Sequence, residues 1–246
     1  MTLQVTKPKP ARVTLTEPSA ESLVDLRRRH WLWLLAGFPF AFAVPFLLAD
    51  TLDLNRDLFY GLYALAVAGF VAAWARNTRL TRRDLLRSWR WGLVLGALGA
   101  AVTGFIVFRT EDATDRPGGP ELVATILWRG VLYGATDGVL LSVFPILAVF
   151  AAFAGTRLRR RVSGKLVIGT IAMLASIGIT AVYHLGYSDF RSEKVRKPIV
   201  GDVIWSAPTL VTLSPFGAPI AHIGLHVSAV VHSNETDTFL PPHGNP

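Results

Sequence analysis

One stretch decides how the chain folds: VIWSAPTLVTLSPFGAPIAHIGLHVSAVVH, from Val203 to His232. It is apolar and long enough to cross a bilayer, but three prolines interrupt it and three histidines follow them. A proline inside a helix removes a backbone hydrogen bond and costs about 3 kcal/mol. We therefore predict that 203–219 is not one continuous transmembrane helix. Instead, 203–214 forms a short re-entrant piece, and a new helix begins near Pro219, a residue type favoured in the first helical turn.

The composition of the whole chain is that of a membrane protein. Of its 246 residues, 51% are hydrophobic and 17% are charged, and the mean hydropathy is +0.41. The net charge of +8 does not indicate nucleic acid, because the basic residues cluster beside apolar runs, where they orient the protein and contact anionic lipid. Cysteine is absent, which excludes disulfides, thiolate metal sites and a cysteine nucleophile.

The apolar runs predict an all-α fold, a polytopic transmembrane bundle of about six to eight hydrophobic segments with a broken or re-entrant last segment. We assign 27–232 to this bundle, 1–26 to a flexible cytoplasmic tail and 233–246 to a polar, proline-rich tail. Before the last stretch, the runs are 31–49, 58–75, 91–108, 121–155 and 166–187. Gly92 and Gly96 form a small-xxx-small pair suited to close helix packing.

The run 121–155 is too long for one upright span, since it would measure about 52 Å at about 1.5 Å per residue. We predict an interfacial or re-entrant first part, followed by a span near 131–154 that is kinked around Pro145.

The basic residues predict the orientation. The three loops expected inside hold fourteen lysines and arginines and the three expected outside hold seven: 27–29, 76–90 and 156–165 against 50–57, 109–120 and 188–202. Because cytoplasmic loops carry the excess of basic residues, we expect a plasma-membrane protein with a cytoplasmic N-terminus.

Four polar residues are expected to meet inside the membrane. His222 and His226 are four residues apart, so both lie on one helical face and could bind one divalent metal ion such as Zn²⁺. Counted from a helix start near Pro219, they lie about 5 Å and 10 Å below that start, at the outer depth of His184. Asp137 lies about 9 Å into a span that starts near 131. We expect the three histidines and Asp137 to line one pocket, although histidines hydrogen-bonded within a bundle would give the same pattern.

Arg129 lies eight residues before Asp137, about two helical turns earlier. Two interpretations stay open: an ion pair with Asp137, or a side chain that extends to the outer interface.

Three short motifs resemble those of the CAAX-protease and bacteriocin-processing superfamily of intramembrane proteases. They are LWRGVLYG (127–134), YHLGY (183–187) and HIGLH (222–226). The resemblance covers roughly 121–232 and implies a multi-pass helical fold that performs metal-dependent proteolysis.

The family pattern is two adjacent glutamates, an Arg-Gly pair four residues after the second, then Phe-xxx-His and His-xxx-Asn or His-xxx-Asp. Arg129 and Gly130 match this pattern. The glutamate positions hold Ala124 and Thr125, Thr180 stands in place of the phenylalanine, and His226 stands in place of the asparagine or aspartate. Glu121, one turn before Ala124, is a neighbouring carboxylate that could serve as base.

The combined hypothesis is metal-assisted hydrolysis of a membrane-embedded peptide or small molecule. His184, His222 and His226 would be the metal ligands, and Asp137 or Glu121 the base, with Arg129 nearby. Three alternatives stay open. One is a catalytically inactive relative that keeps the helical scaffold and the polar pocket. The second is a non-enzymatic binding or transport protein that uses the broken last segment as its site. The third is a protein with bis-histidine haem.

The orientation can be tested by labelling single cysteines in intact cells, because the chain has none of its own. We expect a membrane-impermeant maleimide to label Thr114→Cys, in an outer loop, and not Ser163→Cys, in an arginine-rich loop. The reverse pattern of labelling would contradict the predicted orientation.

Overall fold

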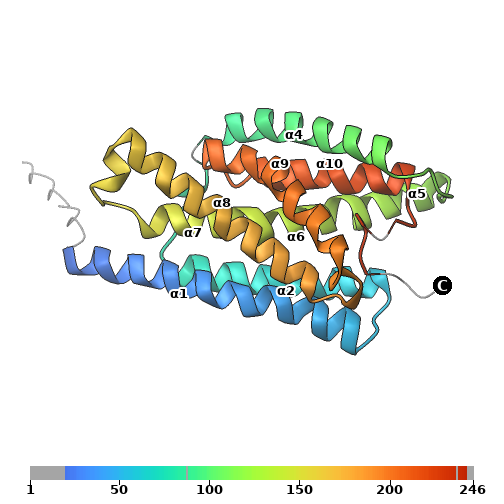
Figure 1. Ribbon diagram of the computed structural model, residues 1–246, viewed down its shortest axis with the longest axis horizontal. Helices are drawn as coiled ribbons and strands as arrows, with labels where there is room; N and C mark the ends of the chain where they lie inside the picture. Colours follow the sequence, from blue (N-terminus) through green and yellow to red (C-terminus); the bar gives the residue numbers. More distant parts are fainter. Residues whose placement is uncertain (1–19, 87, 237, 243–246) are drawn as a thin grey trace, which may run out of the picture.

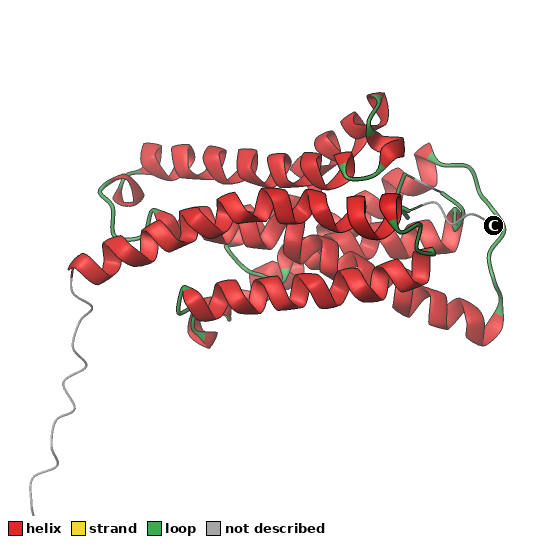
Figure 2. Ribbon diagram, turned by 90° about the horizontal axis from the view of Figure 1, so that it is seen from below, coloured by secondary structure: helices red, strands yellow, loops and turns green. Residues whose placement is uncertain are grey.

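The computed structural model describes residues 20–86, 88–236 and 238–242, and these form helices that run back and forth along one axis (Figure 1). The α-helices are α1 (Ala20–Pro45), α2 (Arg56–Asn77), α3 (Arg82–Leu85), α4 (Trp89–Thr110), α5 (Gly119–Thr125), α6 (Tyr133–Asp137), α7 (Phe144–Ala152), α8 (Val162–Leu185), α9 (Arg196–Thr212) and α10 (Gly217–His232). Three π-helical stretches, η1 (Phe46–Thr51), η2 (Ile126–Leu132) and η3 (Gly138–Val143), continue or join them. Short 3₁₀ turns are η4 (Leu158–Arg160), η5 (Ser188–Phe190) and η6 (Glu193–Val195). No strand occurs among the described residues, which confirms the all-α prediction (Figure 2).

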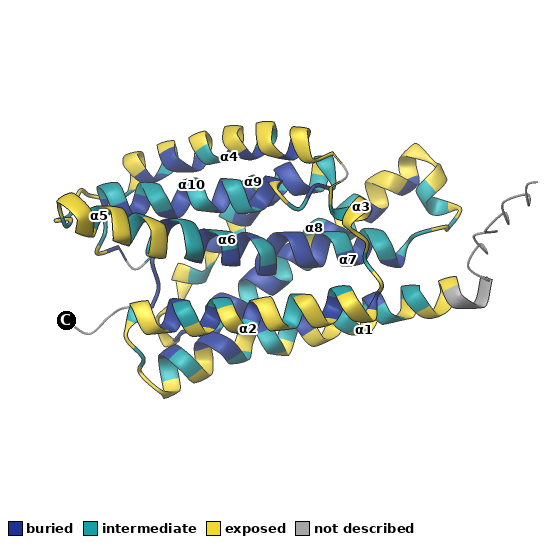
Figure 3. Cartoon of the chain, turned by 180° about the vertical axis from the view of Figure 1, so that it is seen from behind, coloured by how far each residue is buried: buried dark blue, intermediate teal, exposed yellow. Residues whose placement is uncertain are grey.

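Five helical segments are long and apolar enough to cross a membrane. They are Leu23–Thr51, Arg56–Asn77, Trp89–Thr110, Gly119–Ala152 and Val162–Leu185. Large apolar side chains on their outer faces are exposed, among them Leu65 at 71%, Phe105 at 66% and Leu166 at 69% (Figure 3). Such faces are favourable against lipid tails and unfavourable in water. The fold is therefore that of a multi-pass membrane protein.

The bundle begins earlier than expected. Helix α1 starts at Ala20, so 20–26 belongs to the helix and not to the predicted flexible tail. The remainder of that tail, 1–19, lies outside the described residues.

The run 121–155 is one helical segment, Gly119–Ala152, without the predicted re-entrant part. The stretches η2 and η3 lie inside it. Because a π-helical turn holds more residues than an α-helical turn, the segment spans a shorter distance than an α-helix with the same number of residues. Pro145 follows η3 and cannot bond back to Leu141. The carbonyl oxygen of Leu141 instead accepts a hydrogen bond from Ser176 Oγ at 2.8 Å. The proline is thus accommodated by the π-helical stretch and by a side chain of α8.

The predicted break in the last stretch is confirmed, and it lies between α9 and α10. Leu213 adopts a left-handed conformation with φ 53° and ends α9. Thr209 Oγ1 then joins the two helices, because it donates to Ser214 O at 3.0 Å and accepts from the Ala218 N–H at 2.8 Å. Side chains therefore satisfy backbone groups that the break would otherwise leave unpaired.

The helices around the break differ from the sequence-based prediction in extent. Helix α9 starts at Arg196, within the expected outer loop 188–202, and contains Pro208. The α9–α10 pair forms a helical hairpin in place of a short re-entrant piece (Figure 1).

Helix α10 also runs opposite to the direction that the depth estimate assumed. Leu213, just before it, lines a groove with Arg159 and Lys165 at the arginine-rich end of the bundle. His232, at its other end, contacts the 109–120 loop, because its carbonyl oxygen accepts a hydrogen bond from the Thr114 N–H at 3.0 Å. The two histidines reach the level of His184 by this reversed path.

Helix α10 is held between two rows of glycines. On one side, a β-carbon at Gly96 would lie 2.8 Å from Gly217 O and 2.9 Å from Ile220 Cβ, which confirms the packing role predicted for Gly96. On the other side, a β-carbon at Gly134 would lie 2.9 Å from the His222 carbonyl oxygen. Backbone therefore packs directly against backbone, as in close helix pairs of membrane proteins.

This contact predicts a difference between two Gly→Ala substitutions. Gly96→Ala should destabilise the fold by about 1–3 kcal/mol, because the Gly217 carbonyl must move away from the new methyl group. Gly69→Ala in α2 meets nothing within 4 Å and should be neutral or stabilising by up to about 1 kcal/mol. Unfolding of both variants in detergent micelles measures the difference. Equal stability of the two would contradict the packing described.

Candidate functional site

Asp137, His222 and His226 form a buried group in which one ligand atom from each lies within 4.8 Å of the others. Asp137 is the last residue of α6, and the two histidines lie one turn apart on α10. His226 Nε2 is 3.3 Å from Asp137 Oδ2. The glycine contacts between α6 and α10 bring the two backbones close enough for these short side chains to meet.

Two imidazole nitrogens in this group have no hydrogen-bond partner among the described residues: His222 Nδ1 and His226 Nε2. Buried polar atoms in proteins nearly always form hydrogen bonds. Two nitrogens without one, of which His226 Nε2 has only the Asp137 carboxylate at 3.3 Å, therefore require an explanation. Imidazole nitrogen and carboxylate oxygen are the atoms that bind zinc and related divalent ions. The donor set therefore fits a metal ion.

The opposite nitrogen of each ring is held by the protein. His226 Nδ1 lies 2.6 Å from the Phe239 carbonyl oxygen, to which it donates in the tautomer that leaves a lone pair on Nε2. His222 Nε2 lies 3.4 Å from Ser142 Oγ. Metal-binding histidines commonly donate their other N–H in this way, which fixes the tautomer and the ring orientation.

A buried chain of hydroxyl groups continues from His222. Ser142 Oγ and Ser206 Oγ are 2.6 Å apart, and Ser206 Oγ lies 2.9 Å from Asp202 Oδ1. Asp202 is fully buried and also accepts from Thr180 Oγ1 at 3.0 Å. Asp202 was not predicted as part of the site, because the pattern of basic residues indicated that 188–202 is an outer loop.

Asp137 is oriented by another residue that the sequence did not indicate. Tyr63 donates its hydroxyl to Asp137 Oδ1 at 2.8 Å, which leaves Oδ2 as the oxygen near His226. Tyrosine is common in apolar helices, so nothing in the pattern of α2 singled out Tyr63.

His184 lies beside the group without being part of it. It lines the same cavity of about 30 Å³ as Asp137, His222 and His226. Its Nδ1 is 2.8 Å from the Thr180 carbonyl oxygen. The structure thus brings together two of the three expected histidine ligands, and Asp137 occupies the third position in place of His184.

Arg129 does not pair with Asp137. Its guanidinium makes a bidentate contact with Asp57 at the start of α2, at 2.8 and 2.7 Å. The ion pair with Asp137 does not form because Arg129 lies within η2, whose π-helical turns change the helical register before Asp137.

Glu121 is exposed in the first turn of α5 and does not line the cavity. It is sixteen residues before Asp137, on the order of 20 Å along a helix axis. The positions of Arg129 and Glu121 therefore do not support catalytic roles at this group.

The C-terminal segment 233–242, described except for residue 237, covers the cavity and is not only a polar tail. Thr238, Phe239 and Pro241 line it, and Leu240 is fully buried. Arg56 holds the segment, since its Nε donates to Pro242 O at 2.9 Å and its Nη1 to Asn234 O at 3.1 Å. The segment separates the group from the end of the bundle opposite the arginine-rich loops.

The chain matches no protein-family model, no curated protein and no solved structure. Its own geometry is that of a multi-pass helical membrane protein with a buried Asp/His group that could hold a metal ion.

The contacts of Arg56 predict that it keeps the covering segment closed. In the otherwise cysteine-free chain, Leu240→Cys should react slowly with maleimide because position 240 is buried. Combining it with Arg56→Ala should speed the reaction at least tenfold, since two hydrogen bonds to the segment are lost. Glu193→Cys, which is exposed, serves as the control and should react equally fast in both backgrounds. An unchanged rate at position 240 would show that Arg56 is not the anchor.

Proposed function

We propose that the chain is a membrane-embedded, metal-dependent hydrolase in which Asp137, His222 and His226 bind one divalent ion such as Zn²⁺. The observation that carries this proposal is a buried group of two imidazoles and one carboxylate in which one nitrogen of each imidazole makes no hydrogen bond within the described part of the chain. Polar groups inside a membrane protein are costly unless they meet one another, water or an ion. A bound cation would satisfy all three side chains at once.

The number of ligands favours catalysis over a purely structural role. Catalytic zinc sites use three protein ligands and keep one position open, whereas structural sites are closed by four. The ligand set of one carboxylate and two imidazoles is of the three-ligand kind. When bound, such an ion activates water and polarises a carbonyl or phosphoryl oxygen.

The surrounding residues hold the ligands and can take up a proton. Tyr63 fixes the Asp137 carboxylate, and the Phe239 carbonyl fixes the His226 ring. His184 lies in the same cavity, and because its Nδ1 donates to Thr180 O, its Nε2 carries a lone pair. We assign His184 the role of general base, in place of Glu121 or Asp137.

A distant relationship to the CAAX-protease and bacteriocin-processing superfamily is part of this proposal. It is supported by the Arg129-Gly130 pair and by His184 and His222, which stand at the two histidine positions of the family pattern. The carboxylate beside the histidines comes from Asp137, whereas the positions of the family's glutamates hold Ala124 and Thr125. The proposed reaction is therefore hydrolysis, without a commitment to peptide bonds.

Haem is disfavoured by the position of the histidines. His222 and His226 are on the same helix with ring centroids 6.1 Å apart and nearly parallel. Two axial ligands must approach haem iron from opposite faces of the macrocycle. The cavity that both histidines line has a volume of about 30 Å³, which is enough for an ion and a water and far too small for a porphyrin.

Metal analysis tests the proposal directly. After loading with Zn²⁺ and desalting, the detergent-purified chain should retain about one ion per molecule, as measured by inductively coupled plasma mass spectrometry. His222→Ala and His226→Ala should each weaken binding by on the order of a hundredfold or more, because a direct ligand matters at least as much as an outer partner. His184→Ala should keep the ion, since His184 is not one of the three ligands.

The matched control is His232→Ala, on the same helix. His232 contacts the Glu111 carbonyl oxygen at the far end of α10 and should not affect the metal content. A wild-type chain without bound metal, or equal losses in the His232 and His226 variants, would contradict the proposed metal centre.

A further inference from the structure

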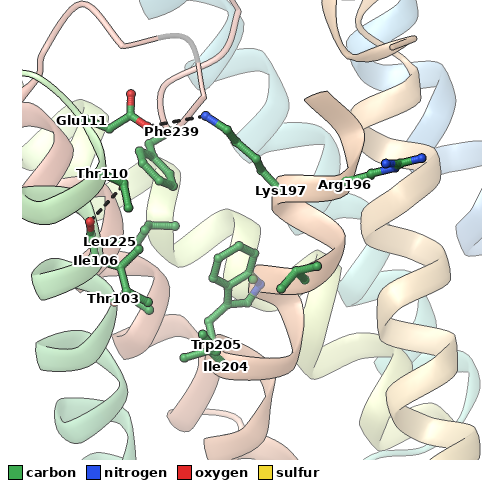
Figure 4. Close-up of a pocket in the computed structure, with 12 residues that line it drawn as sticks. Thr103, Ile106, Thr110, Glu111, Arg196, Lys197, Ile204, Trp205, Leu225 and Phe239 are labelled. Carbon is green, nitrogen blue, oxygen red and sulfur yellow. Dashed lines mark hydrogen bonds and ion pairs between the residues drawn. The ribbon is translucent and has the colours of Figure 1, made fainter. Parts of the chain in front are cut away.

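A larger cavity of about 430 Å³ lies between α4, α9 and α10 (Figure 4). Its volume falls within the range of small-molecule sites, about 300–1,000 Å³. The apolar part of its wall is formed by Ile106, Val200, Ile204, Trp205, Leu225 and Phe239. Val200 is 67% exposed, so the cavity opens on the outer surface of the bundle beside α9.

The hydroxyl and indole groups in this wall are already paired. Thr103 Oγ1 donates to the Ala221 carbonyl oxygen at 3.2 Å, and Thr110 Oγ1 donates to the Ile106 carbonyl oxygen at 2.9 Å. Trp205 Nε1 donates to Asp202 at 3.1 Å. The wall therefore offers a ligand little besides apolar surface, which suits a hydrocarbon chain.

One end of the cavity is charged. Figure 4 shows Lys197 extended across this end toward Glu111, while Arg196 points away. Lys197 Nζ is 3.8 Å from Glu111 Oε1, a long ion pair, and Glu111 Oε2 is already engaged by Thr236 at 3.1 Å. The Lys197 side chain is 62% exposed, and an ammonium has three donors. Lys197 can therefore bind a second anionic oxygen at the mouth.

The cavity adjoins the proposed metal centre. Trp205 and Leu225 form the partition between the two spaces, and Lys197 and Phe239 line both. A ligand with its chain in the large cavity and its head at Lys197 would carry its polar end to the edge of the Asp137, His222 and His226 group.

We infer that this cavity binds a single-chain amphiphile with an anionic head group, either a carboxylate or a phosphate. The chain occupies the apolar space between α4 and α9, and the head contacts Lys197. One part of the inference rests on the proposed function: that this amphiphile is the class of substrate for the metal centre. Binding itself needs no metal.

Photo-crosslinking with a fatty acid that carries a diazirine in its chain tests the inference on the detergent-purified full-length protein. We expect saturable labelling on α4 and α9, mapped by peptide mass spectrometry. Unlabelled fatty acid and lysophosphatidic acid of equal chain length should compete, and the stronger competitor identifies the head group. A neutral monoacylglycerol should compete at least tenfold less well, because it lacks a charge-assisted contact with Lys197.

Two pairs of variants separate specific from general binding. Ile106→Trp fills the cavity and should lower labelling at least tenfold, whereas Phe105→Trp, at an exposed neighbouring position of α4 that does not line the cavity, should not. Lys197→Gln should weaken competition by the anionic amphiphiles about tenfold, and Lys194→Gln, which does not line the cavity, should not. Equal labelling of the two tryptophan variants would overturn the site, and equal competition by monoacylglycerol would overturn the anionic head.

The two proposals fail separately. The double variant His222→Ala, His226→Ala should lose metal and still be labelled like wild type. Labelling without any bound metal in the wild-type chain would refute the metal centre and support the amphiphile site. Bound metal without labelling of the cavity would support the metal centre and refute the amphiphile site.

Discussion

The close contact of backbones along α10 is the constraint on which the rest of the structure depends. Gly96 on α4 and Gly134 on α6 leave no room for a side chain where they meet this helix. Because both faces of α10 are fixed by backbone atoms, the helix cannot slide or rotate to relieve its polar side chains. His222 and His226 are consequently held against Asp137, although each of these groups would be easier to accommodate at a membrane surface.

The polar residues inside the bundle are held by contacts with one another and with neighbouring backbone groups. Tyr63, Phe239 O and the Ser142–Ser206–Asp202 chain each occupy one atom of the Asp137, His222 and His226 group. These contacts remove much of the freedom that the side chains would otherwise have. A site whose ligands are already oriented loses little conformational entropy when an ion binds. The price is a buried network that tolerates few changes.

Much of this arrangement could be predicted from local patterns. The prolines of 203–219 indicated a break, the four-residue spacing placed His222 and His226 on one face, and Gly96 indicated close packing. Three features could not be predicted, because they depend on tertiary structure. The π-helical stretch that contains Arg129 changes the register before Asp137, α10 runs toward the opposite end, and the described part of 233–242 folds back over the cavity. A sequence pattern carries the period of a helix, but not its direction in the bundle or the path of a terminal segment.

The shared lining of the two cavities determines how a molecule in one of them would meet the other. The small cavity is closed toward one end of the bundle by the C-terminal segment, while the large cavity opens sideways between α4 and α9. A lipid-soluble molecule would therefore reach the large cavity sideways, from within the bilayer, while the covered end of the bundle shields the small cavity. Phe239 lines both cavities, so one side chain of the C-terminal segment lies where the two spaces adjoin. The position of that one side chain therefore decides whether the two cavities are separate or continuous.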